Sequence, residues 1–150
     1  MNTQPSIATV ELLKSCYEED RALLEQFHIA APADAETCAR RTVEDLKNAV
    51  DFSFFTVHKN NDLVGFYGAE HLGNLKALTS FFVRPRYRDS TDEFWSLLQA
   101  HFKGPFVSGL YNKNTRAIRF FERQGGKLVC ELDDQDGRIY LFKSGEKICH

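Results

Sequence analysis

Two stretches near the start of the chain carry apolar residues at helical spacing. Between about Thr9 and Phe27 apolar positions recur every three or four residues, and charged residues, Asp20 among them, fall on the opposite side. After a break at AAPADAET, a second apolar stripe runs to Val50, with Asp34 in place as a helix cap. The pattern therefore predicts two amphipathic helices, each with one face on a core.

From Asp51 onward the periodicity changes to that of strands. Three strands are predicted in succession, at residues 52–59, 63–71 and 75–83, joined by an Asn/Asp turn and by the turn Gly73-Asn74. The third strand, LKALTSFFV, is apolar almost throughout, which is typical of a strand buried on both faces. We therefore expect an antiparallel meander in the middle of the chain.

The last part of the chain adds two helices and three strands. The helices are predicted over Asp92–Phe102 and 112–124, the second ended by Gly125-Gly126. The strands are predicted at Pro105–Tyr111, 126–132 and 138–143. In the first of these helices the residues expected to face the core are Phe94, Leu97, Leu98 and His101, with Trp95 beside them. The order of elements predicts an α+β fold with one central sheet.

Composition narrows the class of protein. A chain of 150 residues, 43% hydrophobic and 27% charged, is typical of one soluble globular domain. A net charge of -2 argues against nucleic-acid binding. We find neither an apolar run of about 18 residues nor a secretory signal, so we expect a cytoplasmic protein that does not bind membranes. The four scattered cysteines fit reduced thiols and no metal site.

Two short motifs on these elements carry a resemblance to a known family. The first is Val83-Arg84-Pro85-Arg86-Tyr87-Arg88, which matches V-x-P-x-[YH]-R at the end of a strand. The second fits N-x-x-A-x-x-[FL]-Y-x-x-x-G-F through Asn114, Ala117, Ile118, Phe120 and Gly125. With the order of elements over about Asp51 to Lys143, they resemble the GNAT superfamily of acyl-CoA-dependent N-acetyltransferases.

The resemblance implies a GNAT-like three-layer α+β fold, in which helices cover both faces of a central mixed, mostly antiparallel sheet. We expect one GNAT-like domain over residues 1–150, with a helical part at about 9–50 and a core at about 51–143. The family's usual first strand is not found before the two helices. The strand Leu75–Val83 is expected to splay from Pro105–Tyr111 and leave a V-shaped opening.

The resemblance also implies acetyl-CoA as co-substrate and places its site. In the family, main-chain groups of the splayed strand pair with the pantetheine arm, and Phe81, Phe82 and Val83 match them. Asn114 would contact the same arm. Phe121 stands where the family often has a tyrosine that protonates the leaving thiolate. The family's glycine loop for the pyrophosphate corresponds to Arg88, Asp89, Ser90, Thr91, Asp92 and Glu93.

That loop departs from the family, because Asp89, Thr91 and Glu93 stand where glycines would let main-chain N–H groups approach the pyrophosphate. Ser90 to Glu93 instead has the S-x-x-E spacing of a capping box, so we expect Ser90 or Thr91 to cap the next helix with Glu93 folded back. A carboxylate about 4 Å from a phosphate costs about 1 kcal/mol in water-like surroundings and about 4 kcal/mol at a protein surface. The sequence therefore predicts a weakened phosphate site.

Basic residues of the same segment offset part of that cost. Arg84, Arg86 and Arg88 alternate along the chain, so we expect them to share one face as a partly solvated stripe. Arg88 also keeps the arginine position of the family's motif.

Candidate catalytic residues lie at the ends of strands. Glu70 or His71 would act as the general base, although an ordinary solvated strand end is the more common reason for such a pair. Tyr111 would be a substitute acid. The first hypothesis is an N-acetyltransferase that acts on a small-molecule amine or a protein amino group. Two alternatives stay open: a GNAT-fold module that binds a protein or small ligand without catalysis, and a structural subunit. A homodimer is also left open.

Overall fold

The computed structural model describes residues 1–21, 24, 34–133 and 136–143. Its elements are β1 (Asn2–Pro5), α1 (Val10–Tyr17), α3 (Ala35–Lys47), β2 (Phe52–Lys59), β3 (Asp62–Leu72), β4 (Leu75–Val83), the 3-10 helix η1 (Pro85–Ser90), α4 (Thr91–Phe102), β5 (Phe106–Tyr111), α5 (Thr115–Arg123), β6 (Lys127–Leu132) and β7 (Gly137–Phe142). The predicted strands and helices are thereby confirmed. Of the first predicted helix, residues 22–23 and 25–27 lie outside the described residues.

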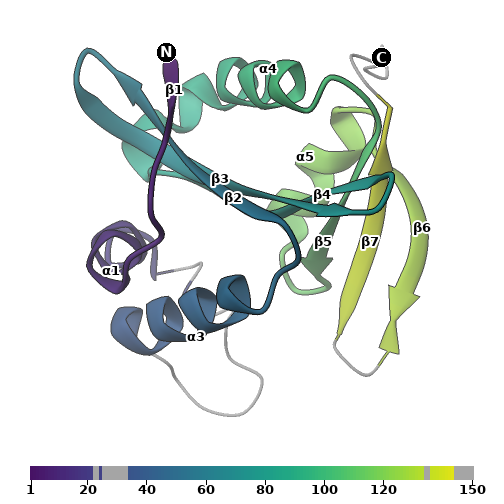
Figure 1. The fold of residues 1–150 in the computed structure, drawn as a ribbon, viewed down its shortest axis with the longest axis horizontal. Coiled ribbons are helices and arrows are strands. Elements are labelled where there is room, and N and C mark those ends of the chain that lie inside the picture. The colour runs from purple at the N-terminus through teal and green to yellow at the C-terminus, as the bar shows by residue number, and fades with distance from the viewer. Residues whose placement is uncertain (22–23, 25–33, 134–135, 144–150) are drawn as a thin grey trace.

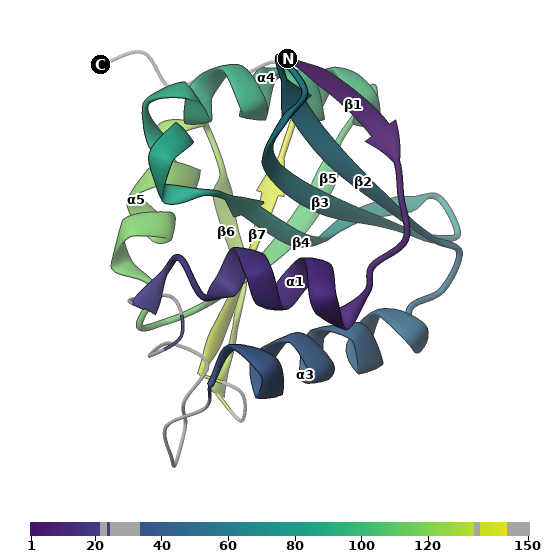
Figure 2. The ribbon, with the colours of Figure 1, turned by 90° about the vertical axis from the view of Figure 1, so that its left-hand side faces the viewer.

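The described strands form one sheet in the order β1-β2-β3-β4-β5-β7-β6, antiparallel throughout except for the parallel pair β4 and β5. Helices α4 and α5 cover one face, and α1 and α3 cover the other (Figures 1 and 2). The first face packs around Trp95 and Phe106, and the second around Tyr17 and Phe66. The predicted three-layer α+β architecture is confirmed.

Strand β1 is an element that the sequence pattern did not predict. It pairs antiparallel with β2, with Asn2 opposite His58 and Pro5 opposite Phe55. The segment N-T-Q-P has no apolar alternation, so its own sequence does not mark it as a strand. Its pairing gives partners to main-chain groups of β2 that would otherwise lie at the edge of the sheet.

Three local signals in the sequence, one helix cap, one hairpin turn and one helix stop, are confirmed. Asp34 caps α3, its side chain accepting a 2.7 Å hydrogen bond from the N–H of Thr37. Asn60 and Asn61 both have positive φ, 54° and 67°, as a tight hairpin turn requires. Gly125 has φ 88° just after α5, the left-handed conformation that commonly ends a helix.

Helix α4 begins without the predicted capping box. Ser90 is the N-cap residue but makes no side-chain capping bond, and the Thr91 hydroxyl donates to the Arg88 carbonyl at 2.6 Å. Glu93 is not folded back, since its carboxylate lies 3.8 Å from the amino group of Met1. The reason is η1, whose i to i+3 geometry leads directly into α4 and directs the Thr91 N–H to the Arg88 carbonyl.

The buried face of α4 also differs from the prediction. Phe94 and Leu98 are buried as expected and Trp95 is fully buried, but His101 is exposed. Phe102 is buried in its place because Trp95 and Phe102, seven positions apart, face the sheet together. His101 lies at the rim, where partial burial lowers the pKa of its imidazole.

Strand β4 pairs with its two neighbours over different lengths. It pairs with β3 from Leu75 to Val83, but with β5 at the positions of Ala77 and Leu78 alone. Beyond those two positions β4 and β5 diverge, so the predicted V-shaped opening is confirmed.

A bulge in β4 lies next to the point of divergence. Gly68 of β3 faces Ser80 while Ala69 faces Leu78, which leaves Thr79 as an extra residue in β4. Gly68 is closely surrounded there, since a Cβ at this position would lie 2.6 Å from the Thr79 hydroxyl and 3.0 Å from the Ser80 hydroxyl. The absence of a side chain at Gly68 therefore allows the bulge to pack against β3.

Of the predicted partly solvated arginine stripe after β4, Arg86 is 56% exposed but Arg84 is largely buried. The strand ends at Val83, and the Arg84 side chain, only 13% exposed, donates to both oxygens of Glu19 at 2.8 and 2.6 Å and to the Leu63 carbonyl at 2.8 Å. Arg86 contacts the same Glu19 carboxylate at 3.3 Å. These ion pairs join the segment after α1 to the sheet.

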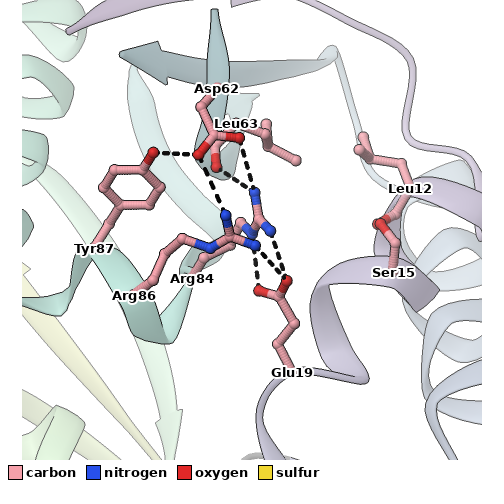
Figure 3. A network of polar contacts seen from close by, with 8 residues as sticks. All are labelled: Leu12, Ser15, Glu19, Asp62, Leu63, Arg84, Arg86 and Tyr87. Carbon is pink, nitrogen blue, oxygen red and sulfur yellow. Dashed lines mark hydrogen bonds and ion pairs between the residues drawn. The ribbon is translucent and has the colours of Figure 1, made fainter. Parts of the chain in front are cut away.

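Asp62 completes this network from the other side. Figure 3 shows the guanidinium groups of Arg84 and Arg86 between the carboxylates of Glu19 and Asp62. Hydrogen bonds from Arg84 hold the pKa of Glu19 below its ordinary value. The Tyr87 hydroxyl donates a hydrogen bond to Asp62, and this bond lowers the pKa of the Asp62 carboxyl below its ordinary value.

Gly68→Ala is expected to lower the free energy of unfolding by about 1–3 kcal/mol, because the added methyl overlaps Thr79, Ser80 and Phe52. Urea denaturation measures the effect. Gly104→Ala is the matched control, since the nearest atom to a Cβ there is the Lys76 nitrogen at 3.9 Å. Equal stabilities of the two variants would contradict the packing at the bulge.

Glu19→Gln is expected to lower the stability at pH 7, because the amide retains only part of the interaction with Arg84. The folded-state pKa of Glu19 is depressed, so its contribution is present above the unfolded pKa of about 4.3 and is lost as the pH falls through the folded pKa. The stability difference from wild type should therefore shrink at low pH.

Denaturation series at pH 7, 5 and 3 measure this difference. Glu44→Gln, on the exposed side of α3, is the control and should show a smaller effect at pH 7. A Glu19→Gln difference that stays constant down to pH 3 would show that the charge of Glu19 does not contribute.

Candidate functional site

A cleft of about 620 Å³ lies where β4 leaves β5, between the end of β4 and helix α5. The residues that line it are Asp20, Phe81, Phe82, Val83, Arg88, Thr91, Asn114, Thr115, Arg116, Ala117, Arg119, Phe120 and Arg123. One wall is thus the apolar end of a strand, and the other is a helix rich in arginine. Beyond Leu78 the side of β4 that faces β5 has no strand partner in the described part of the chain.

The cleft brings together several residues that the sequence predicted to contact the cofactor. Those that line it are Phe81, Phe82, Val83, Arg88, Thr91 and Asn114. Asn114 also begins α5, and its side chain accepts a 3.1 Å hydrogen bond from the N–H of Ala117. The Thr91 N–H already donates to a carbonyl of η1, so this loop position is not a free main-chain donor.

The other predicted loop residues do not line the cleft. These are Asp89, Ser90, Asp92 and Glu93. The Asp92 carboxylate accepts a 2.6 Å hydrogen bond from the Gln124 side chain, and Glu93 lies by the amino group of Met1. The predicted repulsion between loop acids and a phosphate therefore does not arise at Glu93, because the turn of η1 and α4 directs its side chain elsewhere.

Phe121 lies in the core and not in the cleft. It is 1% exposed, and its ring packs against those of Trp95, Tyr140 and Phe142. The preceding residue, Phe120, lines the cleft instead. A tyrosine at position 121 would therefore place its hydroxyl in the core of this protein.

An arginine stripe on α5 was missed by the sequence analysis. Arg116, Arg119 and Arg123 all line the cleft, at spacings of three and four residues that place them on one face of the helix. The Arg123 guanidinium lies 5.4 Å from the centre of the Phe120 ring. Guanidinium groups bind phosphate oxygens through charge-assisted hydrogen bonds. The spacing was visible in the sequence and could have identified this stripe.

Asp20 is the acidic residue that does line the cleft, although its sequence position predicted a solvent-facing side chain. It is 6% exposed, forms an ion pair with Arg88, and lies 3.7 Å from Arg116. That prediction was wrong because Arg88, 68 positions later in the chain, buries it. No local pattern reveals such a contact.

A second cavity, of about 490 Å³, lies beside the paired part of β4 and β5, next to the end of α3. Glu70, Asp45, Thr79 and Ser108 are among the residues that line it. The Glu70 carboxylate accepts a 2.6 Å hydrogen bond from the main-chain N–H of Val50, which orients it. This cavity and the first cleft thus adjoin β4 on either side of Ser80, at 77–79 and 81–83.

The structure separates the three candidate catalytic residues. Glu70 lines the second cavity, whereas His71, the next residue of β3, is exposed and lies toward His101 on the α4 side of the sheet. Tyr111, 43% exposed at the end of β5, is not among the residues that line either cavity. Glu70 is therefore the candidate base that shares a cavity with the splayed strand.

Among the described residues, no three His, Cys, Asp or Glu side chains gather as a metal site would require. In the same part of the chain, no helix has the length and apolar character needed to cross a membrane.

No protein-family model matches the sequence, and no curated protein matches it. Solved structures do match the fold. An acetyltransferase from Thermus thermophilus is 15% identical with a TM-score of 0.70, covering 95% of this chain and 97% of its own. A protein from Desulfovibrio desulfuricans, described as a GNAT-family acetyltransferase, is 15% identical with a TM-score of 0.70, covering 96% and 99%.

A third solved structure contains a ligand. The PaiA N-acetyltransferase from Thermoplasma acidophilum, in complex with coenzyme A, is 15% identical with a TM-score of 0.63, covering 95% of this chain and 99% of its own. At such identities the similarity establishes the architecture of the chain. The protein has the GNAT fold.

Proposed function

We propose that the protein transfers an acetyl group from acetyl-CoA to an amine. The observation that carries this proposal is the cleft where β4 leaves β5, with an unpaired strand edge on one wall and an arginine stripe on the other. A solved protein of the same fold binds coenzyme A, which supports the choice of ligand.

The chemistry of the cleft residues fits coenzyme A. A pantetheine arm carries amide groups that pair with an open strand edge as a neighbouring strand would, and β4 offers such an edge at Phe81–Val83. Arg116, Arg119 and Arg123 suit the phosphates, in place of the glycine loop that this chain lacks. Acetyl-CoA supplies the acetyl group in activated form, as a thioester.

The amine would enter from the second cavity. Glu70 and Asp45 give this cavity two carboxylates, which suit the ammonium form of an amine. Glu70 is the residue that would accept the proton the ammonium must lose, and the Val50 N–H holds its carboxylate in place. The bulge at Thr79 lies on the side of the second cavity, where a main-chain position is released from the regular ladder.

Ligand binding without transfer is the second candidate function, because a fold does not specify its activity. One observation favours it: the Asp20 carboxylate is paired with Arg88 inside the cleft where a phosphate would bind. The family's usual acid is absent as well, because a phenylalanine, Phe121, stands at its position. Transfer remains the better-supported function, since positioning alone supplies much of the rate of such reactions.

Acetyl-CoA at 100 times its Kd is expected to stabilise the protein by about 2.7 kcal/mol. Ala117→Phe should abolish that stabilisation, because Ala117 lines the cleft on α5 and a phenyl group there fills it. Lys113→Phe, just before α5 and outside the cleft lining, is the control. Thermal unfolding measures both variants, and release of free thiol with a panel of amines reports transfer. Thiol release by none of the amines would favour binding without transfer.

Glu70→Gln is expected to lower kcat about 10²–10⁴-fold, because an amide cannot accept the proton. The amide oxygen still accepts from the Val50 N–H, so the stability should change little. His71→Gln is the control, since His71 lies toward α4. Equal losses in the two variants would exclude a specific role for Glu70.

A further inference from the structure

We propose that Asp20 is an internal anion which occupies the phosphate position of the cleft, so that a phosphate-bearing ligand binds by displacing its carboxylate from Arg88. The inference rests on the proposed function in so far as coenzyme A is the ligand used to test it. It assigns to Asp20 the role of setting the affinity of the cleft for phosphate.

Asp20 is buried in the cleft beside two arginines. It is 6% exposed and lines the cleft, with Arg88 as its ion-pair partner and Arg116 at 3.7 Å. Removing the partners of a buried carboxylate is costly, and two guanidinium groups, those of Arg88 and Arg116, are among the partners of Asp20. These two groups belong to the β4–α4 connection and to α5, the two sides between which a phosphate of the ligand would lie.

The charges of the cleft set Asp20 in competition with a bound phosphate. Its lining contains four arginines and one acidic residue, Asp20. A phosphate that approached Arg88 with Asp20 still in place would meet a fixed like charge in a partly buried site. If the carboxylate leaves, the same guanidinium groups bind the phosphate. The two anions therefore compete for one set of donors.

The neighbouring ion pairs argue against a purely structural role. Glu19 already joins the segment after α1 to the sheet through Arg84 and Arg86 (Figure 3). Neither arginine lines the cleft. The link therefore does not depend on Asp20. Adjacent acids thus have different partners: Glu19 pairs outside the cleft, and Asp20 pairs inside it.

Asp20→Asn tests the inference, because it removes the charge and keeps the shape. Calorimetric titration should show coenzyme A binding about ten-fold more tightly, or better, than to the wild type. Dephospho-coenzyme A, which keeps the pyrophosphate and lacks the 3′-phosphate, should gain equally if the pyrophosphate takes the position of Asp20. Pantetheine, which has no phosphate, should show no gain. Glu19→Gln is the matched control and should leave all affinities unchanged.

A second measurement uses the unaltered protein, in case Asp20→Asn does not fold. Carboxyl-detected NMR should show the Asp20 side-chain carbon shifting when inorganic pyrophosphate is added, while that of Glu19 stays in place. An Asp20 signal that does not move while pyrophosphate binds would overturn the inference. So would a coenzyme A affinity that is equal or lower in Asp20→Asn.

The outcomes separate this inference from the proposed function. Tighter binding by Asp20→Asn without thiol release by either protein supports the role of Asp20 and contradicts acetyl transfer. Equal, tight binding with thiol release supports transfer and overturns the role of Asp20. No binding of coenzyme A by either protein overturns both.

Discussion

The hydrogen-bond ladder between β4 and β5 extends over two register positions, and the arrangement of the candidate site follows from where it stops. Because the two strands are parallel and twist apart, the end of β4 keeps an open edge facing α5. The bulge at Thr79 falls at the same point and bends the strand. Gly68 makes that bulge possible, since any side chain there would overlap it. A sheet that was continuous from β4 to β5 would close the cleft between β4 and α5.

Ion pairs fix the arginines that lie next to the open edge of β4. The segment after β4 contributes three arginines, and each is matched by an acid from another part of the chain. Glu19 and Asp62 bind Arg84 and Arg86 away from the cleft, which fixes η1 against the sheet and α1. Arg88 is different because its partner, Asp20, lies within the cleft. The stripe on α5 is more exposed and closes the opposite wall.

The parts of this structure that were predictable are those set by neighbours in sequence. Strand alternation, the turn at Asn60-Asn61, the cap at Asp34 and the stop at Gly125 are all local, and each was confirmed. Strand β1 was missed because it is held by pairing with β2 and not by its own residues. The prediction of a capping box at Ser90 was wrong because the 3-10 helix η1 precedes α4. Its Arg88 carbonyl accepts the Thr91 N–H, and Ser90 makes no side-chain capping bond.

The candidate site was predictable where backbone chemistry defines it and where a motif residue such as Arg88 or Asn114 marks it. Phe81 to Val83 were found because a strand edge does not depend on its side chains. Side-chain roles were not found in the same way: Phe121 matches the motif position of an acid yet faces the core, and Asp20 matches a solvent-facing position yet lies in the cleft. Both depend on contacts between segments far apart in the sequence.

The motif V-R-P-R-Y-R therefore predicts where the arginines lie in the chain, but it does not predict which anion each of them binds. In a glycine loop the donors are main-chain N–H groups, which carry no counter-charge and remain open to a ligand. Arginines in their place need a partner in the absence of ligand, because a half-buried guanidinium is costly when left unpaired. A phosphate site built from arginine side chains thus also needs an acid, and in our proposal that acid takes part in the binding equilibrium. In this chain Glu19 and Asp62 serve the arginines outside the cleft, and Asp20 serves the one within it.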